Sequence, residues 1–250
     1  MKGRQPIAAL TAYDYPMARL LDECGVSLLL VGDSLGMVVL GLPDTTGVTL
    51  TEMEHHTRAA ARAQPRALLA ADLPKGSYDT YDKAVAHARQ LVAAGAEAVK
   101  AEGGSIIRRQ VEAIVEAEIP FIGHIGMLPQ HVHEEGGYHV KGKTEQECEA
   151  LMSDAEALVD AGAFAIVLEL VSPELAAKLT EALPVPTIGI GSGPDCDGQI
   201  LVTTDLWATS PDYIPRHVQP HMQVPVEMRT AVGEWLAELR PADMRASRCD

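Results

Sequence analysis

The sequence predicts a (β/α)8 barrel, in which eight parallel strands alternate with helices and close into a cylinder. Three observations support this fold class. Short apolar runs rich in strand-forming residues recur eight times, amphipathic segments lie between them, and the runs are continuously apolar. Continuously apolar strands are typical of a parallel sheet that is covered by helices. Eight such strands in about 200 residues indicate a closed barrel.

The elements follow one another in regular order. Strands are expected near residues 6–11, 27–32, 67–71, 96–101, 119–123, 163–168, 185–190 and 199–203. The clearest amphipathic helices are expected at 51–63, 80–94, 105–117, 145–161 and 173–182. AGAEAVKAE at 94–102 is echoed by AGAFAIVLE at 161–169, and in both a helix ends, a strand follows and a glutamate closes it. The echo favours a repeated strand and helix unit.

The chain carries no composition break, so a single domain over residues 1–250 is expected. An irregular, proline-rich segment is expected near 205–225, followed by a C-terminal helix near 225–239. Trp235 on this helix could pack on the barrel or on a neighbouring subunit.

Composition excludes several classes of function. The net charge is −15, the acidic residues are dispersed along the chain and basic residues form only short clusters such as Arg108 and Arg109, which argues against nucleic-acid binding. No apolar run reaches the roughly 18 residues that span a membrane, and the N-terminus lacks a signal-peptide pattern, so a cytoplasmic protein is expected. The cysteines are widely spaced without zinc-ligand spacing, so neither a zinc site nor a disulfide framework is expected. An anionic substrate would need a local cation in so acidic a protein.

Polar side chains follow successive strands where the strands end. They are Asp33, Asp72, Lys100 and Glu102, His124, and Glu169. In a barrel the carboxyl ends of all strands lie on one rim, where active sites of this architecture are found. One aspartate there could be a helix cap, but four carboxylates on successive strands indicate a functional site.

Carboxylates that converge on one rim repel each other unless a cation lies between them. An all-oxygen ligand set without thiolates favours Mg²⁺, and Mn²⁺ or Co²⁺ could substitute. Such an ion is a Lewis acid that would stabilise the enolate of a 2-oxo acid. The rim therefore predicts a metal-assisted reaction of a small 2-oxo acid.

Several linked segments carry a family resemblance. The chain resembles the ketopantoate hydroxymethyltransferase family in LLLVGDSLGMVVLG, ADLPKGSY, AGAEAVKAEGG, GHIGMLPQHVHEEGGYHVKGK, AGAFAIVLE and IGIGSGPDCDGQILV. The resemblance implies a barrel of the phosphoenolpyruvate/pyruvate superfamily. It also implies transfer of a hydroxymethyl group from 5,10-methylenetetrahydrofolate to 3-methyl-2-oxobutanoate, which gives 2-dehydropantoate for pantothenate and coenzyme A biosynthesis.

The same resemblance implies roles for individual residues. Mg²⁺ would bind Asp33, Asp72 and Glu102, and the 2-oxo acid would contact Asp33, Ser34, Asp72 and Lys100. Glu169 would be the catalytic base that removes the proton from C3 of the oxo acid. His124 either hydrogen-bonds the substrate or the outer shell of the metal, or is a buried structural histidine. The family forms large homo-oligomers, often decamers, so a homo-oligomer is expected.

Some positions depart from the family's usual pattern. The loop at Gly47 is one residue shorter, Lys75 stands for a usual Phe, and His139 for a usual Lys. These changes bear on folate docking, the lid over the site and subunit packing. Two alternatives therefore stay open: a metal-dependent 2-oxo acid aldolase or lyase that uses another aldehyde, and a non-catalytic barrel protein. The second predicts loss of rim residues, and the rim is intact.

Overall fold

Eight parallel strands close into a barrel in the computed structural model, which describes residues 2–210 and 214–239. The strands are β1 (Ile7–Thr11), β2 (Leu28–Val31), β3 (Leu68–Asp72), β4 (Ala98–Glu102), β5 (Phe121–Gly126), β6 (Ala165–Glu169), β7 (Thr187–Ile190) and β8 (Gly198–Leu201). Each strand pairs with the next in the chain, and β8 pairs with β1. The predicted fold class is confirmed.

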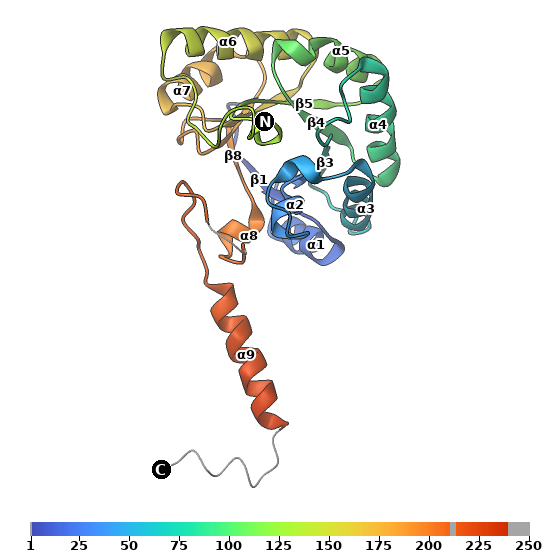
Figure 1. Cartoon of the computed structure of the whole chain (residues 1–250), viewed down its shortest axis with the longest axis vertical. Helices are drawn as coiled ribbons and strands as arrows, with labels where there is room; N and C mark the ends of the chain where they lie inside the picture. The colour runs from blue at the N-terminus through green and yellow to red at the C-terminus, as the bar shows by residue number, and fades with distance from the viewer. Residues whose placement is uncertain (1, 211–213, 240–250) are drawn as a thin grey trace. The chain divides into compact units, whose positions relative to one another are not determined.

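Helices cover the outside of the barrel (Figure 1). They are α1 (Tyr15–Glu23), α2 (Leu35–Val38), α3 (Leu50–Ala61), α4 (Tyr81–Ala94), α5 (Arg108–Glu116), α6 (Glu145–Asp160) and α7 (Pro173–Ala182). Three short 3-10 helices lie in the loops: η1 (Thr45–Gly47), η2 (Ser105–Ile107) and η3 (Pro129–His131).

Side-chain caps fix where the longer helices begin. Asp14, Thr49, Thr80 and Thr144 each accept a hydrogen bond from a backbone N–H in the first turn of the helix that follows. At Thr49 and Thr144 a glutamate three residues later completes a capping box. Because each capped helix starts at a fixed residue, the loops that leave the strands have fixed ends.

The barrel interior is lined by alternate residues of every strand. The lining comprises Ile7, Ala9, Leu28, Leu30, Ala70, Ala98, Ile122, Ala165, Val167, Ile188 and Ile200, with Leu68 and Ile190 packed against them. This alternation follows from the two-residue period of a strand, which turns every second side chain inward. The interior is therefore a packed apolar core.

The sequence predictions agree with most of these elements. All eight strands and the five predicted helices are confirmed, with bounds within three residues of those predicted. Helices α1 and α2 were not among the predicted ones. Helix α1 has a recognisable start, since Asp14 caps it and Pro16 lies in its first turn.

The chain divides into two compact units, Met1–Val202 and Thr203–Asp250. The second unit contains α8 (Thr203–Leu206) and α9 (Val224–Glu238). The described residues between these helices form no helix or strand, as expected for the irregular segment, and 211–213 lie outside the described residues. The predicted C-terminal helix is confirmed as α9. The single-domain organisation stays a prediction.

Helix α9 buries none of its residues. Its exposed apolar side chains include Met228, Val232 and Trp235, which lie on one face at helical spacing. No helix among the described residues is long and apolar enough to cross a membrane.

Candidate active site

On four strands, the inward-facing positions that are apolar along the barrel carry ionisable side chains at the carboxyl end of the strand. Each of these side chains lies two or four positions after an apolar residue of the lining. They are Asp72 on β3, Lys100 and Glu102 on β4, His124 on β5 and Glu169 on β6. Strand register pairs Asp72 with Lys100 and Glu102 with His124. The sequence-predicted residues are therefore neighbours inside one rim of the barrel.

Asp33 and Ser34 reach this rim from the turn that follows β2. Gly32 occupies the position there that would point inward, and a Cβ on it would lie 2.9 Å from Ser34 Oγ and 3.6 Å from Asp72 Oδ2. Without that Cβ, the Asp33 backbone N–H donates to Asp72 Oδ2 at 3.1 Å. Ser34 Oγ is hydrogen-bonded to the Tyr13 hydroxyl at 2.9 Å. A hydrogen bond thus links the turn after β2 to Asp72 at the end of β3.

Lys100 is the buried cation of the site. Its Nζ lies 2.9 Å from Asp72 Oδ1 and 3.1 Å from His124 Nδ1, and the residue is 4% exposed. Burial alone lowers the pKa of Lys100, but the charges of Asp72 and Glu102 outweigh burial and raise that pKa above its usual value. Lys100 is therefore protonated and acts as a hydrogen-bond donor.

His124 is held in one neutral tautomer. Burial and the neighbouring charge of Lys100 lower the pKa of His124 well below its usual value. A neutral imidazole whose Nδ1 accepts from Lys100 carries its proton on Nε2. This Nε2 lies 3.2 Å from Glu169 Oε2. The His124 ring therefore links the lysine to the carboxylate of Glu169.

Asp33 and Glu102 are buried carboxylates. Burial, together with the charge of Asp72, raises the pKa of Asp33 to about 7. Burial and the charge of Asp33 raise the pKa of Glu102 well above its usual value. Gln130 contacts both, since its backbone N–H donates to Glu102 Oε2 at 2.9 Å and its side-chain amide donates to Asp33 Oδ2 at 2.8 Å.

These carboxylates suit a hard divalent cation in donor type and in charge. Asp33, Asp72 and Glu102 offer only oxygen donors, and Lys100 offsets a single negative charge among them. Across residues 2–210 and 214–239, no three His, Cys, Asp or Glu side chains form a ready-made metal-binding group. In the arrangement observed, hydrogen bonds from the protein engage oxygens of all three carboxylates.

Backbone strain adjoins Glu169. The next residue, Leu170, has φ of 48°, which a leucine rarely adopts. Two backbone hydrogen bonds hold it there: its N–H donates to the Ile190 carbonyl at 2.9 Å, and its carbonyl accepts from the Lys141 N–H at 2.8 Å. Such strain persists only where surrounding structure enforces it, and it is common at active sites. The chain thus turns sharply directly after this carboxylate.

An ion pair and a hydrogen-bond contact join the loops that leave the rim. Lys75, after β3, lies 2.8 Å from Glu134 in the loop after β5. His133 of that same loop lies 2.8 Å from Asp44, which precedes η1. His139 is exposed in the same loop. The departures from the family pattern therefore lie in the loops and leave the buried residues of the rim unchanged.

Sequence reasoning missed three residues of the site: Gln130, Tyr78 and Tyr13. All three lie in segments that follow predicted strands. They carry no charge at neutral pH, so a search for ionisable strand ends passes over them. Gln130 and Tyr78 lie four and six positions after the ends of β5 and β3, so a search of the loops for uncharged polar residues is the signal that could have found them.

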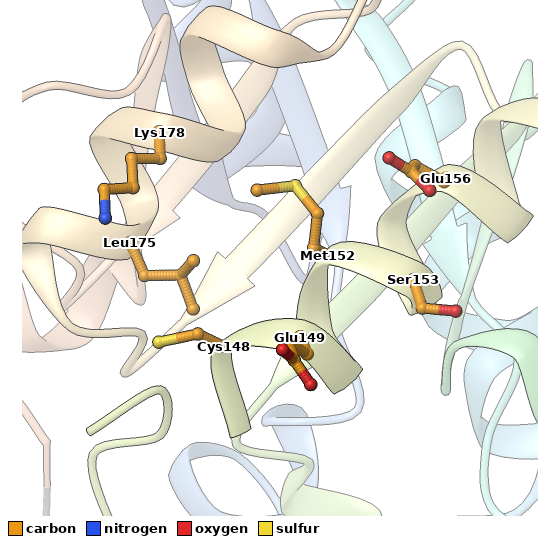
Figure 2. Close-up of a pocket in the computed structure, with 7 residues that line it drawn as sticks. All are labelled: Cys148, Glu149, Met152, Ser153, Glu156, Leu175 and Lys178. Carbon is orange, nitrogen blue, oxygen red and sulfur yellow. The ribbon is translucent and has the colours of Figure 1, made fainter. Parts of the chain in front are cut away.

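A pocket lies on the outside of the barrel. It has a volume of about 360 Å³ and lies between α6 and α7, as Figure 2 shows. Its lining comprises Cys148, Glu149, Met152, Ser153, Glu156, Leu175 and Lys178. None of the sequence-predicted site residues lines it.

The fold is shared with solved structures of low sequence identity. The phosphoenolpyruvate phosphomutase of Streptomyces platensis subsp. rosaceus matches with a TM-score of 0.66 and 16% identity, over 94% of this chain and 84% of the other. A phosphonopyruvate hydrolase in complex with oxalate and Mg²⁺ matches with a TM-score of 0.63 and 15% identity, over 98% and 85%. At these identities the likeness shows the fold alone.

Sequence relatives are much more similar. The 3-methyl-2-oxobutanoate hydroxymethyltransferases of Ignicoccus hospitalis and Pyrobaculum islandicum are 49% and 51% identical to the chain, over 97% and 96% of it and 92% of each relative. That of Geobacter metallireducens is 45% identical over 96% of the chain and 90% of its own length. The profile of the ketopantoate hydroxymethyltransferase family matches residues 1–244. The chain therefore belongs to the ketopantoate hydroxymethyltransferase family.

Proposed function

We propose that this chain transfers a hydroxymethyl group to 3-methyl-2-oxobutanoate, with 5,10-methylenetetrahydrofolate as the donor and 2-dehydropantoate as the product. Its relatives are named 3-methyl-2-oxobutanoate hydroxymethyltransferases, which supports the acceptor and the group transferred. In this proposal the product serves pantothenate and coenzyme A biosynthesis. The contact of His124 Nε2 with Glu169 Oε2 is the observation that carries the proposal, since the reaction needs a base near a cationic substrate site.

Glu169 removes the proton from C3 of the oxo acid, which makes C3 the nucleophile. His124 Nε2 lies 3.2 Å from Oε2 of the carboxylate, which limits how the Glu169 side chain can turn. His124 stays neutral beside Lys100, so it does not compete for the proton that Glu169 accepts. Glu169 is also the most exposed of the ionisable rim side chains on β3 to β6, which suits contact with a substrate.

Lys100, Ser34, Asp33 and Asp72 bind the oxo acid in this proposal. The ammonium of Lys100 supplies the local cation that an anionic substrate needs in a protein of net charge −15. The Tyr13 hydroxyl holds Ser34 Oγ in place, so this hydroxyl is oriented before substrate arrives. Substrate contacts of this kind raise the rate by fixing the reacting groups in position.

Asp33, Asp72 and Glu102 hold Mg²⁺ in this proposal, and Mn²⁺ or Co²⁺ can substitute. Their burial, oxygen donors and excess negative charge support the assignment. When bound, the ion supplies Lewis-acid stabilisation of the negative charge that develops on the oxo acid.

The protein works as a cytoplasmic homo-oligomer in this proposal, a decamer being one form. The exposed apolar side chains of α9 support subunit contact, since an apolar helix face of this kind is typical of an interface. Sedimentation or light scattering of the purified protein tests the state: a monomer at micromolar concentration would contradict it. The proposed partners are small molecules only, the oxo acid and the folate.

Proton exchange at C3 of 3-methyl-2-oxobutanoate in D₂O, followed by NMR, tests the function. Exchange is measured without metal, with Mg²⁺, and then with methylenetetrahydrofolate, and Glu169→Gln is the matched control. Metal-dependent exchange followed by folate-dependent product is the expected result. Exchange without folate-dependent product would favour an aldolase or lyase that uses another aldehyde. No exchange with any metal would contradict the catalytic proposal and favour a non-catalytic barrel.

A further inference from the structure

We propose that Gln130 is a positioning residue that orients Asp33 and Glu102 for the metal ion. The inference rests on the proposed metal site, and it concerns a side chain that is neither a proposed ligand nor a proposed substrate contact.

Gln130 bridges two carboxylates from different parts of the barrel. It lies in η3 after β5 and is 1% exposed. Its backbone N–H donates to Glu102 Oε2 at 2.9 Å, and its side-chain Nε2 donates to Asp33 Oδ2 at 2.8 Å. The same Nε2 donates to the Leu73 carbonyl at 3.0 Å. Both hydrogens of the amide group are therefore committed.

Tyr78 determines which way the amide of Gln130 faces. Its hydroxyl donates to Gln130 Oε1 at 2.6 Å and lies 3.2 Å from the Glu102 carbonyl oxygen. Tyr78 is 8% exposed, so water does not readily replace this contact. Because Oε1 accepts from a hydroxyl, Nε2 must face Asp33. The orientation of the amide follows from the hydrogen bonds on both of its ends.

These contacts leave one oxygen of each carboxylate in a defined direction. Gln130 engages Oδ2 of Asp33 and Oε2 of Glu102, and so it fixes where Oδ1 and Oε1 point. Two buried carboxylates repel each other, and unrestrained side chains would turn apart. Removal of a residue that hydrogen-bonds to a metal ligand and orients it typically weakens metal binding strongly. Gln130 is placed to act in this manner on two ligands at once.

Two substitutions separate the parts of this arrangement. Gln130→Met keeps a side chain of similar length and the backbone N–H to Glu102, but removes the donor to Asp33. Tyr78→Phe removes only the hydroxyl that orients the amide. Thr187→Val is the control, since Thr187 is fully buried at the amino-terminal end of β7 and its hydroxyl bonds Thr180 Oγ1 at 2.6 Å, away from the rim.

Titration calorimetry with Mn²⁺ and Mg²⁺ on the full-length, metal-free proteins gives the dissociation constants, and thermal melting gives Tm. Gln130→Met should weaken metal binding about 10- to 100-fold. Tyr78→Phe should weaken it less but in the same direction, and Thr187→Val should lower Tm without changing metal affinity.

Unchanged metal affinity in both site variants, whatever their Tm, would overturn the role of Gln130 and leave the metal site standing. If Gln130→Met fails to fold, Tyr78→Phe still decides between these results. A folded wild-type protein that binds neither metal would overturn the metal site itself, and this inference with it.

Discussion

Lys100 Nζ lies 3.1 Å from Nδ1 of His124 on the neighbouring strand, and this contact decides which ring nitrogen carries the proton. The pairing of β4 with β5 brings the two residues together. The proton on Nε2 then faces Glu169. A neutral histidine therefore lies between the buried lysine and the carboxylate that we propose as the base.

Replacement of His124 tests this arrangement. His124→Phe removes the ring nitrogen that lies 3.2 Å from Glu169 and should slow C3 proton exchange about 100-fold, because a misplaced base reacts poorly. His124→Gln keeps a side-chain donor and should recover part of the rate. NMR of exchange in D₂O measures both rates, and calorimetry with Mg²⁺ should give dissociation constants close to that of wild type. Equal rates for wild type and His124→Phe would show that the histidine is structural.

Glu169→Gln removes the proposed base but keeps the size of the side chain. We expect C3 exchange to fall about 10²- to 10⁴-fold, the usual contribution of a positioned base. Metal affinity should stay unchanged, since Glu169 is not a proposed ligand. Exchange rates and calorimetry on the same preparation check both statements. A large loss of metal binding would contradict the assigned role.

Asp72→Asn changes a residue with two partners, Lys100 and the Asp33 backbone N–H. It leaves a buried lysine without its paired anion, a loss that typically costs about 3–5 kcal/mol. We therefore expect a lower Tm and weaker binding of both the metal and the oxo acid. Melting curves and calorimetry with each ligand measure these effects. Weaker metal binding with normal oxo-acid affinity would exclude Asp72 as a substrate contact.

The raised pKa of Asp33 leads us to expect that the stability of the metal-free protein depends on pH. Its pKa is about 7 in the folded state against an ordinary value of 3.8, so the folded state keeps a proton that the unfolded state loses. The free energy of unfolding should therefore fall as pH rises from about 4 to about 7, then level off. Asp33→Asn removes this contribution. The free energy of unfolding of the variant should therefore rise relative to that of wild type as pH increases across the same range. Urea denaturation in EDTA from pH 5 to 8 measures the difference, and a constant difference would contradict the prediction.

Gly126 is required by a close approach to Glu169. It pairs with Glu169 across β5 and β6, has φ of 100°, and a Cβ on it would lie 2.2 Å from the Glu169 carbonyl oxygen. Gly126→Ala should lower Tm and slow C3 exchange, because the end of β6 must move. Gly76→Ala is the matched control, since Gly76 has φ of 79° with no neighbour within 4 Å and bears only the conformational cost of about 1–2 kcal/mol. Equal melting temperatures for the two variants would contradict the close-contact argument.

Most of the fold and the charged part of the site could be predicted from sequence. Continuous apolar runs locate strands, and a parallel barrel brings every strand end to one rim, so Asp72, Lys100 and Glu169 had to be neighbours. Which of these side chains contacts which other one was not predictable, because the contacts depend on distances between strands. Gln130 was missed for a related reason. Its proposed role depends on the direction of the two hydrogens of its side-chain amide, which face Asp33 and the Leu73 carbonyl.

Lys100 and Glu102 share a further property that follows from the two-residue period of β4. Both face the barrel interior, while Val99 before Lys100 and Ala101 between the two belong to the opposite phase of the strand. A one-residue insertion or deletion within β4 would exchange the two phases and bring Val99 and Ala101 inward. Such a change would remove the cation and the carboxylate in a single step. In evolutionary terms, a substitution can remove either charge by itself, whereas the gain or loss of a single codon in this strand would remove both charges from the interior together.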